Sequence, residues 1–405
     1  MQKVRYTTKQ EIGYPCISME IIEVKVKWQQ KEFIQMAVPL YKNEPKWIRP
    51  LDKDIEAFFD PDINKTFTNG QCTRWILQDN GKTIGRVAAF VNKKTANKDH
   101  DQPTGGLGLF ECINDQEAAG LLFDTCKTWL QERGMEAMDG PINFGERDKW
   151  WGLLVDGFEK EPNYQCNYNF PYYQQLFENY GFQVYFQGFT FIRNTFDPFH
   201  SRVMQKADVL NQDKDYHFEH LKKKHLMKYG EDFRTVYNKA WAKREGVPEM
   251  SSEQAAAIMN KMKPIIDEKI IWFAYYKGEP VAFYINLPEV NQIFKYVNGK
   301  LDFIGKLKLI YHKLRKTNKK MMGLVFGVAP EHQGKGLDGA LIMATAQMVQ
   351  KDYRRYPILE MNWVQDTNRK MIVVVKQIGA EIGKVHNTYR KLFDETKEFK
   401  RLPIR

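Results

Sequence analysis

The chain has 405 residues, of which 43% are hydrophobic and 27% are charged. This composition is typical of globular proteins and excludes a disordered, collagen-like or disulfide-scaffold chain, and the length predicts two domains or one large domain with insertions. Lysine and arginine outnumber aspartate and glutamate by 61 to 50, a formal net charge of +11. That charge fits an anionic partner such as a nucleotide cofactor, a nucleic acid or a lipid headgroup.

Two further features concern the compartment. No apolar run is long enough to span a bilayer, and the first residues lack the apolar core of a signal peptide, so the expected compartment is the cytoplasm. The cysteines are Cys16, Cys72, Cys112, Cys126 and Cys166. They are odd in number and form no Cys-x-x-Cys motif, which favours free thiols over a zinc site or a disulfide framework. All lie in the first 166 residues, which suggests two halves of separate composition.

The first half alternates strand and helix patterns. Alternating residues predict a strand at 19–26, and a helical pattern follows at 28–41. Strands at 73–77 and 83–91 are joined through Asn80 and Gly81, two residues that tolerate the positive φ of a hairpin turn. The later predicted elements are a strand at 107–113, a helix that starts after Asp115 and stops at Gly134, a helix at 171–180 and a strand at 183–192.

The second half gives nearly the same order after a charged connector at 194–214. Its predicted strands are 216–221, 270–276, 280–287, 321–328, 357–364 and 380–390, and its predicted helices lie within 222–244, 251–266, 336–351 and 368–377. The run at 321–328 is almost continuously apolar, the pattern of a strand buried on both faces. The shared order predicts a tandem repeat of one mixed α/β fold, divided into residues 1–195 and 196–405.

The segment with specific chemistry follows the apolar strand. A glycine-rich turn leads directly into a helix, so unpaired backbone N–H groups and the positive end of the helix dipole converge on one point, where Lys335 adds charge. No Gly-Lys-Ser/Thr follows, which excludes the phosphate-binding loop of nucleotide hydrolases. The surrounding hairpins exclude a dinucleotide fingerprint for Gly334-x-Gly336-x-x-Gly339. The segment therefore predicts an anion site.

At this segment the chain resembles the Gcn5-related N-acetyltransferase (GNAT) superfamily, whose acyl-coenzyme A loop reads Gln/Arg-x-x-Gly-x-Gly/Ala. The resemblance runs from about residue 214 to the C-terminus and includes Asn368 and the helix that ends at Gly379. It implies that acetyl-CoA or a longer acyl-CoA is a co-substrate, with no metal. The residues that it implies in binding are Phe326, Gly327 and Val328 beside the pantetheine arm, then Gln333, Gly334, Lys335, Gly336, Leu337, Asp338 and Gly339 at the pyrophosphate, and Asn368.

The first half resembles a degenerate copy of the same domain. Residues 176–182 match the family's late helix, but the strand at 107–113 runs into its helix without a glycine loop. The resemblance therefore implies that the first half does not bind the coenzyme.

Two positions depart from the family pattern. Asp338 stands where the family has Gly or Ala, so its carboxylate lies either beside the pyrophosphate or in a helix cap. Val375 stands where the family has its usual tyrosine, the group thought to protonate the leaving thiolate. Tyr389 is then the candidate general acid.

Transfer of an acyl group to an amine also needs a base and a stabilised oxyanion. Glu360, mid-strand, is the candidate base if burial raises its pKa, and a solvent-facing residue otherwise. His332, next to the loop, is either a surface residue or a base, and the surface position is favoured. Asn368 hydrogen-bonds either the pantetheine or the turn before its helix, and the turn is favoured.

A second feature is electrostatic. Residues 295–320 carry nine basic residues against Asp302 alone, with apolar residues at helical spacing, so they predict a basic amphipathic helix. Three interpretations compete: a helix whose apolar face packs on its own domain, contact with an anionic membrane surface, and, ranked last, nucleic-acid binding. The aromatic residues Trp150, Trp151 and those at 164–173 either line a groove or pack in a core.

The sequence thus predicts a mixed α/β chain of two tandem GNAT-like domains, at residues 1–195 without an acyl-CoA loop and at residues 196–405 with one. The second is expected to be an acyl-CoA-dependent N-acyltransferase of the EC 2.3.1 class, with an amine acceptor. The alternative is a non-catalytic protein that binds acyl-CoA or a membrane surface. The expected location is the cytoplasm or the periphery of the inner membrane through residues 295–320, with nucleic acid ranked below lipid and cofactor anions as a partner.

Overall fold

A computed structural model of the chain describes residues 19–97, 102–199, 201–241 and 249–404. Cys16 and residues 242–244 of a predicted helix lie outside the described residues. The elements of the N-terminal half are β1 (Met19–Glu23), α1 (Lys27–Gln35), α2 (Ala37–Leu40), α3 (Asp52–Phe59), β2 (Gly70–Asp79), β3 (Lys82–Asn92), β4 (Thr104–Cys112), α4 (Gln116–Gln131), β5 (Ala137–Gly140), β6 (Leu153–Asp156), α5 (Tyr172–Asn179) and β7 (Gln183–Asn194).

The C-terminal half follows. Its elements are α6 (Ser201–Gln212), β8 (Tyr216–His220), α7 (Leu226–Trp241), α8 (Ser252–Met262), β9 (Ile271–Tyr276), β10 (Glu279–Pro288), α9 (Asn291–Phe294), α10 (Phe303–Leu314), β11 (Lys320–Val328), α11 (Leu337–Gln347), β12 (Ile358–Gln365), α12 (Arg369–Gln377) and β13 (Glu381–Leu392). The mixed α/β fold with one order of elements in each half is confirmed.

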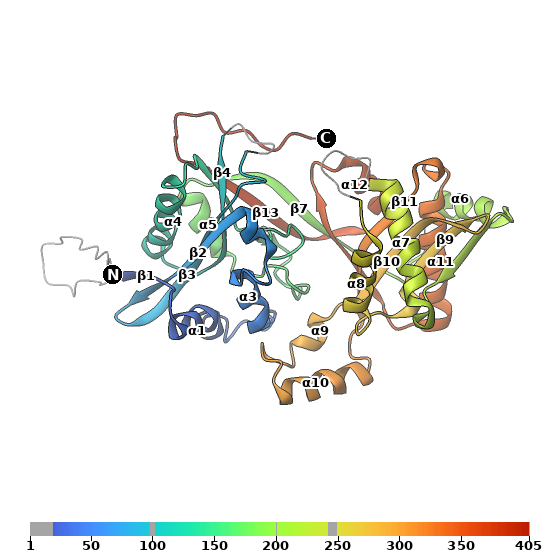
Figure 1. Cartoon of the computed structure of the whole chain (residues 1–405), viewed down its shortest axis with the longest axis horizontal. Helices are drawn as coiled ribbons and strands as arrows, with labels where there is room; N and C mark the ends of the chain where they lie inside the picture. Colours follow the sequence, from blue (N-terminus) through green and yellow to red (C-terminus); the bar gives the residue numbers. More distant parts are fainter. Residues whose placement is uncertain (1–18, 98–101, 200, 242–248, 405) are drawn as a thin grey trace, which may run out of the picture.

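The strands form one continuous sheet in the order β1-β2-β3-β4-β5-β13-β7-β12-β11-β10-β9-β8, with β6 beside β13. The last strand of each half has crossed over. β13, from the C-terminal half, pairs with β5, and β7, from the N-terminal half, pairs with β12. β7 and β13 pair with each other along most of their length and form the centre of the molecule, between the two halves (Figure 1). The exchange makes the two halves one structural unit.

Helices cover both faces of the sheet in each half. In the N-terminal half, α4 and α5 pack on one face and α1 and α3 on the other. In the C-terminal half, α6, α11 and α12 share one face, and α7 and α8 cover the other. Each half is therefore a sheet between two helical layers, with a core on either side.

Several boundaries depart from the prediction. The connector expected at 194–214 contains helix α6. Helix α3 and the short strand β6 were not expected, because four to eight residues carry little periodicity. The expectation that 321–328 is buried on both faces is wrong, since Leu324 is 49% exposed. The boundary between residues 195 and 196 stays a prediction.

Each half contains one pair of parallel strands that pair only at their start. β4 and β5 pair through Thr104–Gly106, and β11 and β12 pair through Lys320–Gly323. Beyond these points the ladders end although β4, β11 and β12 continue. The two places where the ladders end differ between the halves, and this difference defines the candidate site.

Candidate functional site

The candidate site lies where the ladder between β11 and β12 ends. The last paired residues are Gly323 and Met361. Residues 324–328 continue β11, and residues 325–328 keep their antiparallel pairing to β10. Leu324 is bulged at this point, where the register between β10 and β11 shifts, and it is half exposed. After β12 the chain turns away, with the Asp366 N–H donating to the Gln187 carbonyl of β7. The β12-facing edge of 324–328 is thus available to an extended ligand.

The turn after β11 delivers backbone donors to the end of that edge. Gly334 and Gly336 have φ of 76° and 86°, values that residues with a Cβ rarely adopt. Gly336 is the N-cap of α11 and supplies no side-chain cap, so the N–H groups of the first turn are left to a ligand or water. Lys335, between the two glycines, is exposed. The turn is therefore a small cradle of backbone donors at the positive end of a helix, with one lysine beside it.

The equivalent place in the N-terminal half is closed by its own chain. The Ile142 N–H donates to the Leu107 carbonyl of β4 at 2.8 Å. A Cβ at Gly108 would lie 2.1 Å from the Ile142 carbonyl oxygen, so the segment after β5 packs directly on β4. The start of α4 is capped by Asp115, whose carboxylate accepts from the Ala118 N–H at 2.8 Å. A filled edge and an acidic cap leave no room for an anionic ligand here.

The residues predicted for the loop lie together, with one correction. Gln333 donates through Nε2 to the Val328 carbonyl at 3.0 Å and ties the turn to the end of β11. Phe326 and Val328 are half-buried beside the C-terminal core. The capping alternative for Asp338 is wrong, because the N-cap is Gly336 and Asp338 is the second residue of the helix. The Asp338 carboxylate therefore shares the first turn with the backbone donors.

Two neighbouring predictions have separate outcomes. Asn368 caps α12, its Oδ1 accepting from the Met371 N–H at 3.2 Å, as expected for a turn residue. The surface position expected for His332 is wrong, because His332 is only 7% exposed. Its Nδ1 lies 2.6 Å from the Tyr216 hydroxyl, and burial, reinforced by the charge of Lys335, lowers its pKa. His332 packs the turn from behind as a neutral ring.

Glu360 lies in a buried ionic cluster between the halves. Its Oε1 is 2.6 Å from Lys320 Nζ, and its Oε2 is 2.9 Å from Lys384 Nζ and accepts from Asn163 Nδ2 at 2.6 Å. Burial alone would raise the pKa of Glu360, but the two ammonium groups outweigh burial and lower it. The same burial lowers the pKa of Lys384 despite its partner, because two lysines share one carboxylate.

Both expectations for the surroundings of Glu360 are therefore wrong. The carboxyl is neither solvent-facing nor raised in pKa, and both of its oxygens are engaged. A general base needs a carboxylate that is free to take a proton near neutral pH. The geometry instead gives Glu360 a role in holding the two halves together.

The structure does not bring Tyr389 to the loop. Tyr389 lies on β13 opposite Gly140 of the N-terminal half and is fully buried in that half's core, where its hydroxyl donates to Glu178 at 2.9 Å. Val375 is buried in the core beneath the C-terminal sheet. Its cluster contains a different tyrosine, Tyr284 of β10, which sequence reasoning missed because it reads as an ordinary strand residue.

Tyr284 and Asn286 lie at the point where β11 and β12 part. The Tyr284 ring packs on Phe326 at 5.8 Å, and Asn286 Oδ1 would lie 3.5 Å from a Cβ on Gly323. Within the described part of the chain, neither the Tyr284 hydroxyl nor Asn286 Oδ1 makes a hydrogen bond of normal geometry. Burial raises the pKa of Tyr284, so the hydroxyl stays protonated. The Asn286 side chain lies close enough to this hydroxyl to lower its pKa in part, but neither the hydroxyl nor Asn286 Oδ1 has a partner of normal geometry among the described residues. Such incompletely bonded buried polar groups are rare and mark a position where a ligand group could bind.

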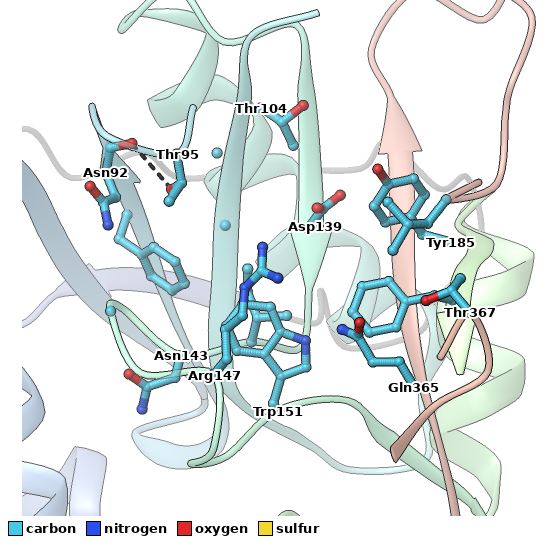
Figure 2. A pocket seen from close by; sticks show the side chains of 17 residues that line it. Asn92, Thr95, Thr104, Asp139, Asn143, Arg147, Trp151, Tyr185, Gln365 and Thr367 are labelled. Atoms are coloured by element: carbon cyan, nitrogen blue, oxygen red, sulfur yellow. Dashed lines mark hydrogen bonds between the residues drawn. The ribbon is translucent and has the colours of Figure 1, made fainter. Parts of the chain in front are cut away.

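A separate cavity of about 120 Å³ lies over the N-terminal sheet (Figure 2). Arg147 and Trp151 stand in the middle of the view, below Thr104 and Asp139. The lining residues on one side of them are Asn92, Thr95 and Asn143, and those on the other are Tyr185, Gln365 and Thr367. Asp139 is bound by Arg390 at 2.6 Å, so its charge is already matched. Sequence reasoning gave Arg147 no role. The cavity holds a group of a few atoms and is too small for a coenzyme.

The aromatic residues of the N-terminal half mainly pack. Trp150, Tyr168 and Tyr173 are buried in its core clusters. Trp151 alone of the residues named from the sequence lines the cavity of Figure 2. The core interpretation is thus correct for most of this cluster.

The described residues contain neither a cluster of metal ligands nor a helix that could span a bilayer. No group of His, Cys, Asp or Glu in the described ranges is placed to hold a metal ion. None of the helices that the structure describes is both long and apolar enough to cross a bilayer. Cys72, Cys112, Cys126 and Cys166 are free thiols.

Comparison with known proteins agrees with this architecture. No family model matches the chain. Among solved structures, a tandem GNAT protein from the clavulanic acid biosynthesis pathway superposes with a TM-score of 0.52 at 9% identity, covering 94% of this chain and 100% of that one. The fold is therefore that of a tandem GNAT protein, as the sequence motif predicted.

Two curated proteins match along nearly their whole length. The bacterial ceramide synthase of Caulobacter vibrioides is 24% identical over 391 residues, which cover 92% of this chain and 97% of the relative. Protein YghO of Escherichia coli is 23% identical over 375 residues, 89% of this chain and 92% of the relative. The chain thus has a tandem GNAT fold and a relative named a bacterial ceramide synthase, which together support an N-acyltransferase.

Proposed function

We propose that the protein is an acyl-CoA-dependent N-acyltransferase whose working site is in the C-terminal half. The observation that carries the proposal is the difference between the two halves. In the C-terminal half, the β12-facing edge of β11 at 324–328 is unpaired and leads to an uncapped, glycine-rich helix start. In the N-terminal half, the corresponding edge of β4 is occupied by the segment at 141–144, whose Ile142 N–H donates to Leu107.

The site residues take definite parts in this proposal. Backbone N–H groups of residues 334–339, with Lys335, bind the pyrophosphate, and residues 326–328 pair with the pantetheine arm as an added strand. The thioester then lies near Gly323 and Met361, where the strands part. The Tyr284 hydroxyl takes the place of the absent tyrosine at Val375 and protonates the leaving thiolate.

The acceptor class is drawn from a relative. One curated relative is named a ceramide synthase, and a ceramide is the amide of a fatty acid with a long-chain amino alcohol. We therefore propose a long-chain acyl-CoA as donor and a long-chain amino alcohol as acceptor. The amine nitrogen attacks the thioester carbonyl, the C–S bond breaks, and the proton lost by the nitrogen balances the one that the thiolate gains.

The test is a thiol-release assay with palmitoyl-CoA and a long-chain amino alcohol, with the amide identified by mass spectrometry. Lys335→Glu should raise the KM for palmitoyl-CoA by about tenfold or more, since a charge-assisted contact is worth about 1.5–3 kcal/mol. Lys351→Glu, an equally exposed reversal at the far end of the same helical segment, should not. Binding without thiol release would favour the non-catalytic alternative, and no binding would exclude the proposal.

A further inference from the structure

Helix α10 presents its apolar face away from the protein. Six of its large apolar residues are between 51% and 76% exposed, namely Phe303, Ile304, Leu307, Ile310, Tyr311 and Leu314, and Leu309 on the opposite side is partly buried. At about 100° per residue the six exposed positions form one continuous stripe along the helix. Figure 1 shows α10 below α9, projecting from the body of the molecule. The interpretation that this face packs on its own domain is therefore wrong.

The opposite face of α10 holds the helix to the protein. Gly305 is buried, and a Cβ there would lie 2.0 Å from the Lys300 carbonyl oxygen, so the helix approaches the preceding turn closely. The His312 ring stacks on Tyr296 with centroids 3.8 Å apart. Asp302 caps the helix, accepting from the Gly305 N–H at 2.8 Å. These contacts fix which side of α10 faces outward.

Basic residues flank the apolar stripe on both sides. On the helical wheel, Lys306 and Lys313 fall on one border of the stripe, and Lys308 and Arg315 on the other. All four are exposed, as are Lys300, Lys316 and Lys319 beside them. The Lys313 ammonium donates to the Pro264 carbonyl of the body at 2.6 Å, so Lys306, Lys308 and Arg315 are the border cations that face outward. Among exposed residues of 300–319, Asp302 is the sole acid, and it serves as the cap. An apolar stripe between two rows of cations matches a surface that is apolar inside and anionic at its border.

An apolar cavity of about 470 Å³ lies behind the same helix. Leu309 and Lys313 line it from α10, and Ile265 and Ile293 line it from the body. The helix therefore rests over a recess instead of a filled core. Little of its apolar area is used in folding, which leaves that area for a partner.

We propose that α10 docks on the surface of an anionic phospholipid membrane, with the six exposed apolar side chains in the interface and the flanking lysines at the headgroups. Interfacial helices of this kind combine an apolar face with cations along its borders, and each lysine near an anionic surface adds about 1 kcal/mol. The docking is independent of the proposed acyl transfer. It would bring the site close to a source of long-chain lipids.

The test is co-sedimentation of the full chain, without acyl-CoA, with phosphatidylcholine vesicles that contain or lack phosphatidylglycerol. Binding is expected only with the anionic lipid and should weaken as salt rises. Leu307→Glu with Leu314→Glu, and separately Lys306→Glu with Lys308→Glu, should each weaken it by about tenfold or more.

The controls place the same changes elsewhere on the surface. Ile63→Glu and Lys82→Glu change exposed residues of the N-terminal half and should leave vesicle binding unchanged. Circular dichroism should show native helix content in every variant, since all changed side chains are exposed. Vesicle binding that persists in both α10 variants would overturn the proposal. So would an absence of vesicle binding combined with a dimer that Leu307→Glu dissociates, because the stripe would then join two copies.

Discussion

Asn163 of the N-terminal half donates to Glu360 of the C-terminal half at 2.6 Å, inside a cluster that also buries Lys320 and Lys384 against the same carboxylate. Glu360 is only 2% exposed. Two ammonium groups thus form ion pairs with one carboxylate. The same carboxylate, on a strand of the C-terminal half, accepts a hydrogen bond from a loop of the N-terminal half. The cluster therefore links the two halves through buried ionic contacts, whose geometry is more specific than that of hydrophobic packing.

Glu360→Gln should lower the free energy of unfolding by about 3–5 kcal/mol, because it removes the carboxylate that both buried ammonium groups contact and leaves Glu289 as the second buried carboxylate near Lys320. Chemical denaturation near neutral pH measures the change. Glu381→Gln, at an exposed position on β13, is the matched control and should change it by less than about 0.5 kcal/mol. A Glu360→Gln protein with unchanged stability and lost turnover would contradict this account and restore the carboxylate as a base.

The free energy of unfolding should depend on pH because the His386 ring is buried in its neutral form. Burial lowers the pKa of His386 to about 3, and its ring stands edge-on to Trp363 with centroids 4.6 Å apart. The folded pKa is below the unfolded value of about 6.5, so the unfolded chain binds the proton first. The stability from the neutral ring is complete above about pH 6.5 and is lost progressively as the pH falls toward 3.

His386→Gln keeps a donor for the Asn167 carbonyl, which His386 Nε2 contacts at 3.1 Å, and removes the titration. The slope of unfolding free energy against pH between about 6.5 and 5 should therefore become smaller than in the native protein. An unchanged slope in His386→Gln would show that the ring does not titrate as the structure requires.

The loop and the halves were predictable from the sequence because both depend on local signals. A strand pattern followed by glycines at 334, 336 and 339 and an apolar helix marks the cradle, and capping residues such as Ser251 and Asp115 mark helix starts that the structure keeps. The hairpin at Asn80 and Gly81 was predictable because these two residue types tolerate positive φ, and both have positive φ in the structure.

What could not be predicted depends on pairing across distance. The crossing of β7 and β13 joins strands some 200 residues apart, and the periodicity of either strand is the same whichever half it pairs with. For that reason the contacts of Glu360 with Lys384 and Asn163 could not be predicted from the sequence. The sequence also could not show that the apolar face of α10 points away from the protein, because an amphipathic pattern identifies an apolar face but not what covers it.

Acyl-CoA should bind at one site per chain. Isothermal titration with palmitoyl-CoA below its micelle-forming concentration is expected to give a stoichiometry near one, because the edge of β4 is filled. Asp115→Ala, which removes the cap of α4, should cost about 1 kcal/mol of stability and leave that stoichiometry and affinity unchanged. Two sites per chain would show that the N-terminal half also binds.

Asp338→Asn should tighten the binding of coenzyme A. Asp338 is in the first turn of α11 beside the proposed pyrophosphate donors. Repulsion between two like charges a few ångströms apart in water is about 1 kcal/mol, so its removal should lower the Kd by up to about fivefold. Titration at two salt concentrations should show the gain fading at high salt. Glu331→Gln, an exposed acid just before the turn, should give a smaller gain, and weaker binding by Asp338→Asn would contradict the orientation of the ligand.

The most direct test of the central claim is amide hydrogen exchange with and without coenzyme A, read by mass spectrometry. The account predicts that coenzyme A slows exchange in peptides that cover residues 324–340 and leaves peptides that cover 105–118 unchanged. Protection confined to 105–118, or no protection at either place, would contradict a coenzyme site in the C-terminal half.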